Sequence, residues 1–100
     1  MIYTIKDENV LINLRGELDI ANADVFKKNC IKIADEKKLG FIIDCKDLTF
    51  IDSTALGAFV AVNKKIKSYN KKIEIINLRP NIKKLFMITN LDKSMDITEE

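Results

Sequence analysis

The sequence predicts one small α/β domain with a mixed β-sheet of four to five strands and about three main helices, in the order β-β-α-β-α-β-α(-β). Three observations predict this class. Apolar runs of strand length alternate with amphipathic segments of helix length. Most helices follow a single strand, an order that right-handed crossovers convert into a core of parallel strands. The chain has 100 residues, 47% of them hydrophobic, so we expect a single domain over 1–100 with one core.

Alternating or continuous apolar runs indicate the strands, and apolar residues three and four apart indicate the helices. In chain order, we expect strands at 2–6 and 9–15, a helix at 21–38, a strand at 41–45, a helix at 54–69, a strand at 72–77, a helix from residue 80 and an edge strand at 95–98. Gly16 is expected to end the second strand, which leaves 16–19 as a loop. Asp19 or Asn22 is the candidate N-cap of the first helix, and Gly40 its left-handed terminator.

In the second half of the chain, the run at 41–45 is apolar on successive residues, which predicts a strand covered on both faces. A polar connection at 46–49 is expected to follow. Pro80 suits the first turn of the third helix. The inner stripe of that helix is expected to consist of Ile82, Leu85, Phe86 and Thr89. Asn90 is expected to end the helix in a left-handed conformation, with Leu91 as its hydrophobic contact.

Composition argues against an enzyme. The chain has no histidine, which removes the commonest general base and metal ligand. Its three glycines do not cluster into a phosphate loop, so no cofactor is expected. Cys30 and Cys45 form no CxxC pair, and they are interpreted as small buried hydrophobic residues. No apolar run approaches the roughly 20 residues of a membrane span, and no signal peptide is evident, so a cytoplasmic location is expected.

Charge and acidic clusters have ordinary interpretations. The net charge is only +2, but residues 63–84 carry eight lysine and arginine residues against Glu74 alone. Nucleic-acid surfaces usually interleave aromatic residues with basic ones, so we interpret these lysines as solvated helix faces and expect no nucleic-acid partner. Asp44, Asp47 and Asp52 could suggest a magnesium site. They belong to one stretch of chain, however, whereas hard cations need oxygens from separate segments, so no metal is expected.

Ser53 is the sharpest candidate, because it places a hydroxyl beside a carboxylate at the start of a helix. The simple interpretation is that Asp52, Ser53 or Thr54 caps the helix, worth about 1 kcal/mol. The following residues, 55–62, carry no charge and no hydrogen-bonding side chain, so the helix start is either deeply buried or meets a partner. A phosphate on Ser53 would add about −1.5 to −2 charges there and disturb such an interface.

Three segments together resemble the STAS domain, most closely the bacterial anti-sigma factor antagonists of the sporulation and general-stress type. They are GELD (16–19), DCKDLTFIDSTALG (44–57) and NLRPNIKKLFMITNLDK (77–93). The resemblance implies a domain, monomeric when free, that binds an anti-sigma factor and thereby releases a sigma factor. In such systems the anti-sigma factor is itself a serine kinase, which phosphorylates the antagonist with ATP and ends the binding, and a separate serine phosphatase restores it.

Carried over by residue, the resemblance implies that Ser53 is the phosphorylated serine. It also implies a set of partner-contacting residues, namely Asp19, Asp52, Thr54, Ala55, Leu56 and Gly57. Two features depart from the family pattern: Ala55 replaces a usual glycine, and the chain stops at Glu100, where relatives often continue into a short helix. An adaptor or structural STAS subunit of a transport or stress-sensing assembly is the alternative function, and an enzyme is the weakest.

Overall fold

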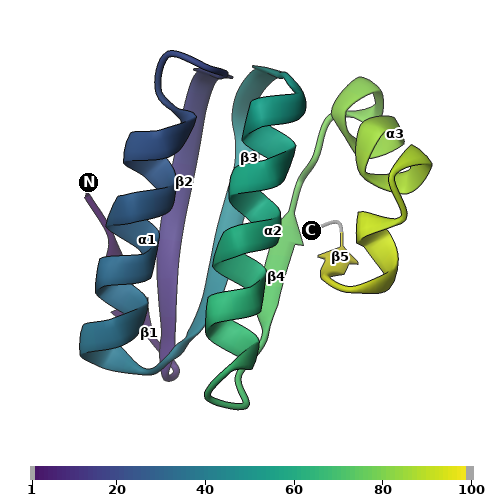
Figure 1. Cartoon of the computed structure of the whole chain (residues 1–100). Helices are drawn as coiled ribbons and strands as arrows, with labels where there is room; N and C mark the ends of the chain where they lie inside the picture. Colours follow the sequence, from purple (N-terminus) through teal and green to yellow (C-terminus); the bar gives the residue numbers. More distant parts are fainter. Residues whose placement is uncertain (1, 99–100) are drawn as a thin grey trace.

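The computed structural model describes residues 2–98 as a five-stranded sheet with three α-helices (Figure 1). The strands are β1 (Thr4–Lys6), β2 (Asn9–Leu18), β3 (Gly40–Ile51), β4 (Ile73–Ile76) and β5 (Asp96–Thr98). The helices are α1 (Ala23–Lys37), α2 (Ser53–Lys67) and α3 (Pro80–Ile88), followed by the short 3₁₀ helix η1 (Leu91–Lys93). The strand order is β1-β2-β3-β4-β5, with β1 antiparallel to β2 and the other pairs parallel. The predicted element order and mixed sheet are confirmed.

All three helices pack on the same face of the sheet. Each crossover from β2 to β5 moves one strand along in the same direction, and crossovers of one hand then fall on one side. Figure 1 shows α1 and α2 side by side in front of the strands. The ring of Phe59 in α2 contacts Phe26 of α1 and Phe86 of α3, with centroid distances of 5.4 and 5.2 Å. These contacts place all three helices in one layer.

The prediction that 41–45 is covered on both faces is therefore wrong. Phe41, Ile43 and Cys45 are fully buried under the helices, whereas Ile42 and Asp44 point to the other face and are half-exposed. Successive apolar residues mislead here because Ile42 is apolar without belonging to the core cluster.

Strands β2 and β3 are longer than expected because two β-bulges interrupt the pattern of alternation. Between β2 and β3, Asn13 pairs with Asp44, but Arg15, two residues later, pairs with Asp47, three residues later. A second shift of the same kind follows Gly16. Each shift gives β3 one extra residue, so its buried residues Cys45, Leu48 and Ile51 recur every third position rather than every second. The expected connection at 46–49 and loop at 16–18 are strand instead. Gly16 lies within β2 at a φ of +72°, a conformation that glycine adopts without steric cost.

The end of the first helix also differs from the prediction. The left-handed residue is Lys38, with a φ of 55°, and Gly40 already begins β3. Gly40 is needed for a different reason, because a Cβ there would lie 2.6 Å from Asn9 Oδ1 and 3.0 Å from the Lys72 carbonyl oxygen. The close approach of the chain at 72 to the start of β3 therefore excludes a side chain.

The C-terminal part follows the prediction with one correction. Pro80 begins α3, Asn90 is left-handed with a φ of 61°, and β5 forms the expected edge strand beside β4. The inner stripe of α3 is only Ile82 and Phe86; Leu85 is 37% exposed and Thr89 is also exposed. A helix of nine residues that packs at one edge of the layer buries a narrower stripe than its sequence suggests.

The two cysteines are buried, as expected. Cys30 lies in α1 and Cys45 in β3, and both side chains are inaccessible. Burial raises the pKa of each thiol to about 12. Neither thiol ionises near neutral pH, and both act as packing groups in the core.

The three-ring contact predicts that Phe59 dominates the stability of the helix layer. Replacing Phe59 with Ala should lower the free energy of unfolding by about 3–5 kcal/mol, since the cavity lies where three helices meet. Urea denaturation followed by circular dichroism measures this loss. Val60→Ala, at a neighbouring position that is 44% exposed, is the matched control and should change stability by less than about 1 kcal/mol. Equal effects of the two substitutions would contradict this account of the core.

Candidate functional site

The carboxylate of Asp52 joins the loop before α1 to the start of α2. Its Oδ1 accepts a hydrogen bond from the Ala55 backbone amide at 2.9 Å, which is the N-cap interaction of α2. Its Oδ2 accepts one from the Ile20 amide, also at 2.9 Å, across 32 residues of chain. Of the three candidate caps, Asp52 is therefore the residue that caps α2. One side chain fixes two segments that meet at the carboxyl ends of β2 and β3.

The loop at 19–22 is closed by its own short polar side chains. Asp19 Oδ1 accepts from the Ala21 amide at 2.9 Å, and its carbonyl oxygen accepts from the amides of Asn22 and Ala23 at 3.1 and 2.7 Å. Asn22 occupies the N-cap position of α1, but its side chain makes no cap bond. Instead, Asn22 Oδ1 accepts from the Asp19 amide and Nδ2 donates to the Glu17 carbonyl oxygen. This network leaves Ile20 at the surface, 78% exposed.

Ser53 and Thr54 are the first two residues of α2, and both are exposed. Their backbone amides belong to the first helical turn and find no acceptor among residues 2–98. The Ser53 hydroxyl likewise has no hydrogen-bond partner within this range. The positive end of the α2 dipole lies at the same place. Ser53 therefore presents an accessible hydroxyl at a position that favours an anionic group.

Packing explains half of the apolar run at 55–62. Four of its residues are buried against the sheet and the neighbouring helices, namely Ala55, Ala58, Phe59 and Val62. Ala55 was expected to contact a partner, but its side chain has no exposed surface. Its backbone amide instead donates the hydrogen bond to Asp52. Leu56 is half-buried, while Gly57 and Val60 are exposed. Within the first half of α2, the accessible surface is a narrow strip beside Ser53.

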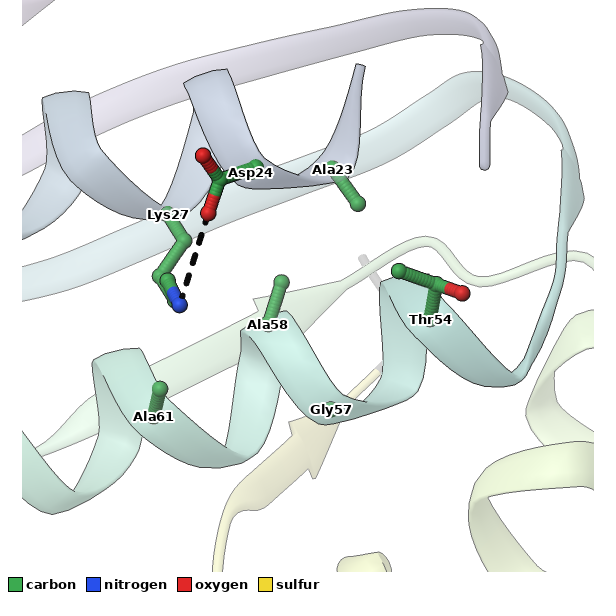
Figure 2. A pocket seen from close by; sticks show the side chains of 7 residues that line it. All are labelled: Ala23, Asp24, Lys27, Thr54, Gly57, Ala58 and Ala61. Atoms are coloured by element: carbon green, nitrogen blue, oxygen red, sulfur yellow. Dashed lines mark ion pairs between the residues drawn. The ribbon is translucent and has the colours of Figure 1, made fainter. Parts of the chain in front are cut away.

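A hollow of about 150 Å³ lies between α1 and α2 next to this strip. Figure 2 shows its small floor, which includes Gly57 and Ala58 of α2, with Thr54 at one end and charged residues of α1 along the opposite wall. Asp24 pairs with Lys27 at 3.5 Å and with Lys28 at 2.9 Å, and the hydrogen bond from Lys28 lowers the pKa of the Asp24 carboxyl. The hollow is therefore a small recess with an apolar floor and one charged wall.

The structure brings the loop that contains Asp19 next to the consecutive residues Asp52, Ser53 and Thr54, through the hydrogen bond between Ile20 and Asp52 across 32 residues of chain. It separates Asp44 from this group: Asp44 Oδ1 accepts from the Lys46 amide and from Asn77 Nδ2 on the opposite sheet face. Within residues 2–98, no three histidine, cysteine or acidic residues are arranged to hold a metal ion.

Sequence reasoning missed Ile20 as part of the site. An isolated apolar residue in an otherwise polar loop was the signal that could have indicated it. The described chain also contains no helix with the length and hydrophobicity of a membrane span.

The domain is a five-stranded sheet with its helices on one face, and an exposed serine begins α2. The chain matches the STAS domain over residues 1–100 and belongs to that family. Within the family it groups with the anti-sigma factor antagonists. It is 32% identical to the anti-sigma-B factor antagonist of Bacillus subtilis (strain 168), an alignment that covers 92% of this chain and 84% of the relative.

Solved structures share this fold. The crystal structure of a putative anti-sigma factor antagonist from Thermotoga maritima superposes with a TM-score of 0.86 at 28% identity, over 99% of this chain and 86% of that one. The unphosphorylated form of the anti-sigma factor antagonist SpoIIAA has a TM-score of 0.77 at 17% identity, over 99% and 88% of the two chains. An identity this low supports a shared fold and nothing more. The phosphorylated form of SpoIIAA, from Bacillus, also has this fold, with a TM-score of 0.75.

The double role of Asp52 gives a direct prediction. Asp52→Ala should lower the free energy of unfolding by about 1–2 kcal/mol, because the α2 cap and the link to Ile20 are both lost. Hydrogen exchange should also accelerate at the amides of Ile20 and Ala55. Asp47→Ala removes a carboxylate of β3, the strand that precedes Asp52, and this carboxylate caps no helix. It is the control and should change stability by less than about 0.5 kcal/mol. Unchanged exchange at both amides in Asp52→Ala would contradict the proposed link.

Proposed function

We propose that this protein is an anti-sigma factor antagonist controlled by phosphorylation of Ser53. In its unphosphorylated form it binds an anti-sigma factor that is also a serine kinase, and this binding releases the sigma factor. The observation that carries the proposal is the exposed Ser53 hydroxyl at the first position of α2, held beside the 19–22 loop by Asp52. The grouping with anti-sigma factor antagonists supports it.

The domain supplies a substrate serine and no catalytic group. The kinase transfers the γ-phosphoryl group of ATP to the Ser53 oxygen, which loses its proton, and ADP leaves. A separate serine phosphatase hydrolyses the phosphate ester and regenerates the binding form. Because the chain has no histidine and its two cysteine thiols are buried, the usual nucleophile–base pairs cannot form in it.

The position of Ser53 explains how a phosphate would switch binding without unfolding the domain. At the start of α2 the phosphate can accept from the free amides of the first turn, and the helix dipole favours its charge by about 0.3–1 kcal/mol. The folded state therefore tolerates the modification. On the surface, the added charge of about −1.5 to −2 lies beside Asp52 and the exposed strip of α2, where it opposes a partner that packs there.

The residues we propose as partner contacts are those around this serine. The exposed or half-buried members are Asp19, Asp52, Thr54, Leu56 and Gly57, together with Ile20. An adaptor role in a transport or stress-sensing assembly is the alternative, and it gives no reason for an accessible serine at this position. We further propose that the domain spans 1–100, is monomeric when free and works in the cytoplasm, where ATP and sigma factors are found.

Phosphorylation tests the assignment directly. Incubation with the cognate anti-sigma factor kinase and γ-³²P-ATP should label the wild-type chain at one site. Ser53→Ala should abolish the label, while Thr54→Ala, which removes the adjacent hydroxyl, should keep it. Phosphopeptide mass spectrometry identifies the modified residue. Labelling of Ser53→Ala at the wild-type level would refute the site, and absence of any label on wild type would favour the adaptor role.

A further inference from the structure

The sheet face opposite the helices is open along residues 2–98. Because every crossover lies on the other side, no helix in this range covers it. Cross-strand partners share a face, so the register identifies its side chains. Leu11 of β2 lies beside Ile42 of β3, and Ile76 of β4 lies beside Asp44 in the next row. The open face thus has an apolar centre made from three adjacent strands.

A hollow of about 400 Å³ lies over this centre. Ile2, Leu11, Ile42 and Ile76 line it, with Asn13 and Asp44 as polar neighbours. The four apolar residues lie outside the main core cluster under the helices. Leu11 and Ile42 are half-exposed, and Ile2 is 92% exposed. Ile76 is only 7% exposed, so Ile2, Leu11 and Ile42 provide the accessible apolar surface of the hollow.

Negative charges outnumber positive ones on the open face. Five carboxylates lie there against three basic residues, since Lys46 and Asp47 both lie between the buried Cys45 and Leu48. The carboxylates are Glu17, Asp44, Asp47, Glu74 and Asp96, and the basic residues are Lys6, Arg15 and Lys46. Asp44 lines the hollow itself. None of the eight residues forms an ion pair within 4.0 Å in the described chain, where the four ion pairs join residues of α1, α2 and Lys38.

We propose that this open face docks a basic amphipathic helix of a partner protein. The apolar stripe of that helix would occupy the hollow over Leu11, Ile42 and Ile76, and its lysine or arginine side chains would lie over the surrounding carboxylates. A helix is the element that commonly covers a sheet face in α/β domains. A second copy of this chain is disfavoured as the occupant, because face-to-face packing would bring two sets of carboxylates together. The surface is separate from Ser53, so it adds a second interaction to the proposed function.

The probe is a designed 18-residue leucine–lysine amphipathic helix with a fluorescent label. Its matched control is the same peptide with every lysine replaced by glutamate. Fluorescence anisotropy should show binding of the lysine peptide at least about tenfold tighter than that of the glutamate peptide, and raising the salt concentration should weaken it because charge contributes. Amide chemical shifts of the ¹⁵N-labelled protein should change at Leu11, Ile42 and Ile76.

Two substitutions test the apolar hollow. Ile42→Thr, which keeps a β-branched side chain in the strand, should weaken lysine-peptide binding about fivefold or more. Ile2→Thr changes a residue that is 92% exposed and should weaken binding without any risk to folding. Ile88→Thr is the matched control, because Ile88 is 65% exposed on α3 in the helix layer, and it should leave affinity unchanged.

The inference is overturned by any of three results. These are shift changes confined to the helices, equal affinity of the lysine and glutamate peptides, or equal loss of affinity in Ile2→Thr and Ile88→Thr. Sedimentation equilibrium of the free protein distinguishes a second copy of the chain from a basic partner as the occupant of the open face. A dimer that Ile42→Thr dissociates would mean that a second copy occupies the face, whereas a monomer agrees with a basic partner.

Discussion

The direction of the strand crossovers is the constraint on which both faces of this domain depend. Because the order β2-β3-β4-β5 is sequential, α1, α2 and α3 all pack on one side, where Phe59 joins them. The same order brings the carboxyl ends of β2 and β3 together, so the loop before α1 lies next to the start of α2. Asp52 can then accept from the amides of Ile20 and Ala55 at once. The serine that follows it gains a fixed position and an exposed hydroxyl.

Much of the fold was predictable from the sequence, because its apolar segments are long and their order leaves few topologies. The strand extensions were not, since bulges near Asp44 and Gly16 replace the period of two by a spacing of three. A local pattern also cannot show whether helices cover one or both faces of a strand. The apolar Ile42 therefore led to the wrong prediction that 41–45 is covered on both faces. Helix-start chemistry and the family motif indicated the position of Ser53 and Asp52 at the start of α2, whereas their functional role stays a prediction. Ile20 and the hollow between the helices depend on contacts across 32 residues and on helix packing, which only the structure shows.

The two surfaces of the domain differ in chemistry as well as in architecture. The helix side presents a serine at a helix start beside a small recess, and a phosphate there changes charge without disturbing the core. The sheet side presents a larger apolar hollow lined by one carboxylate, Asp44, on the face away from the helices. On the proposals above, the phosphorylation-controlled partner and the second partner would use separate surfaces of this 100-residue domain.

The central claim is that a phosphate on Ser53 prevents partner binding while the fold stays intact. Isothermal titration calorimetry of the anti-sigma factor kinase against the unphosphorylated and Ser53-phosphorylated chains tests it most directly, with melting temperatures measured in parallel. We expect phosphorylation to weaken binding by about 100-fold or more, equivalent to about 2.7 kcal/mol, with a change of melting temperature below about 4 °C. Equal affinities, or lost binding accompanied by a large fall in melting temperature, would contradict the claim.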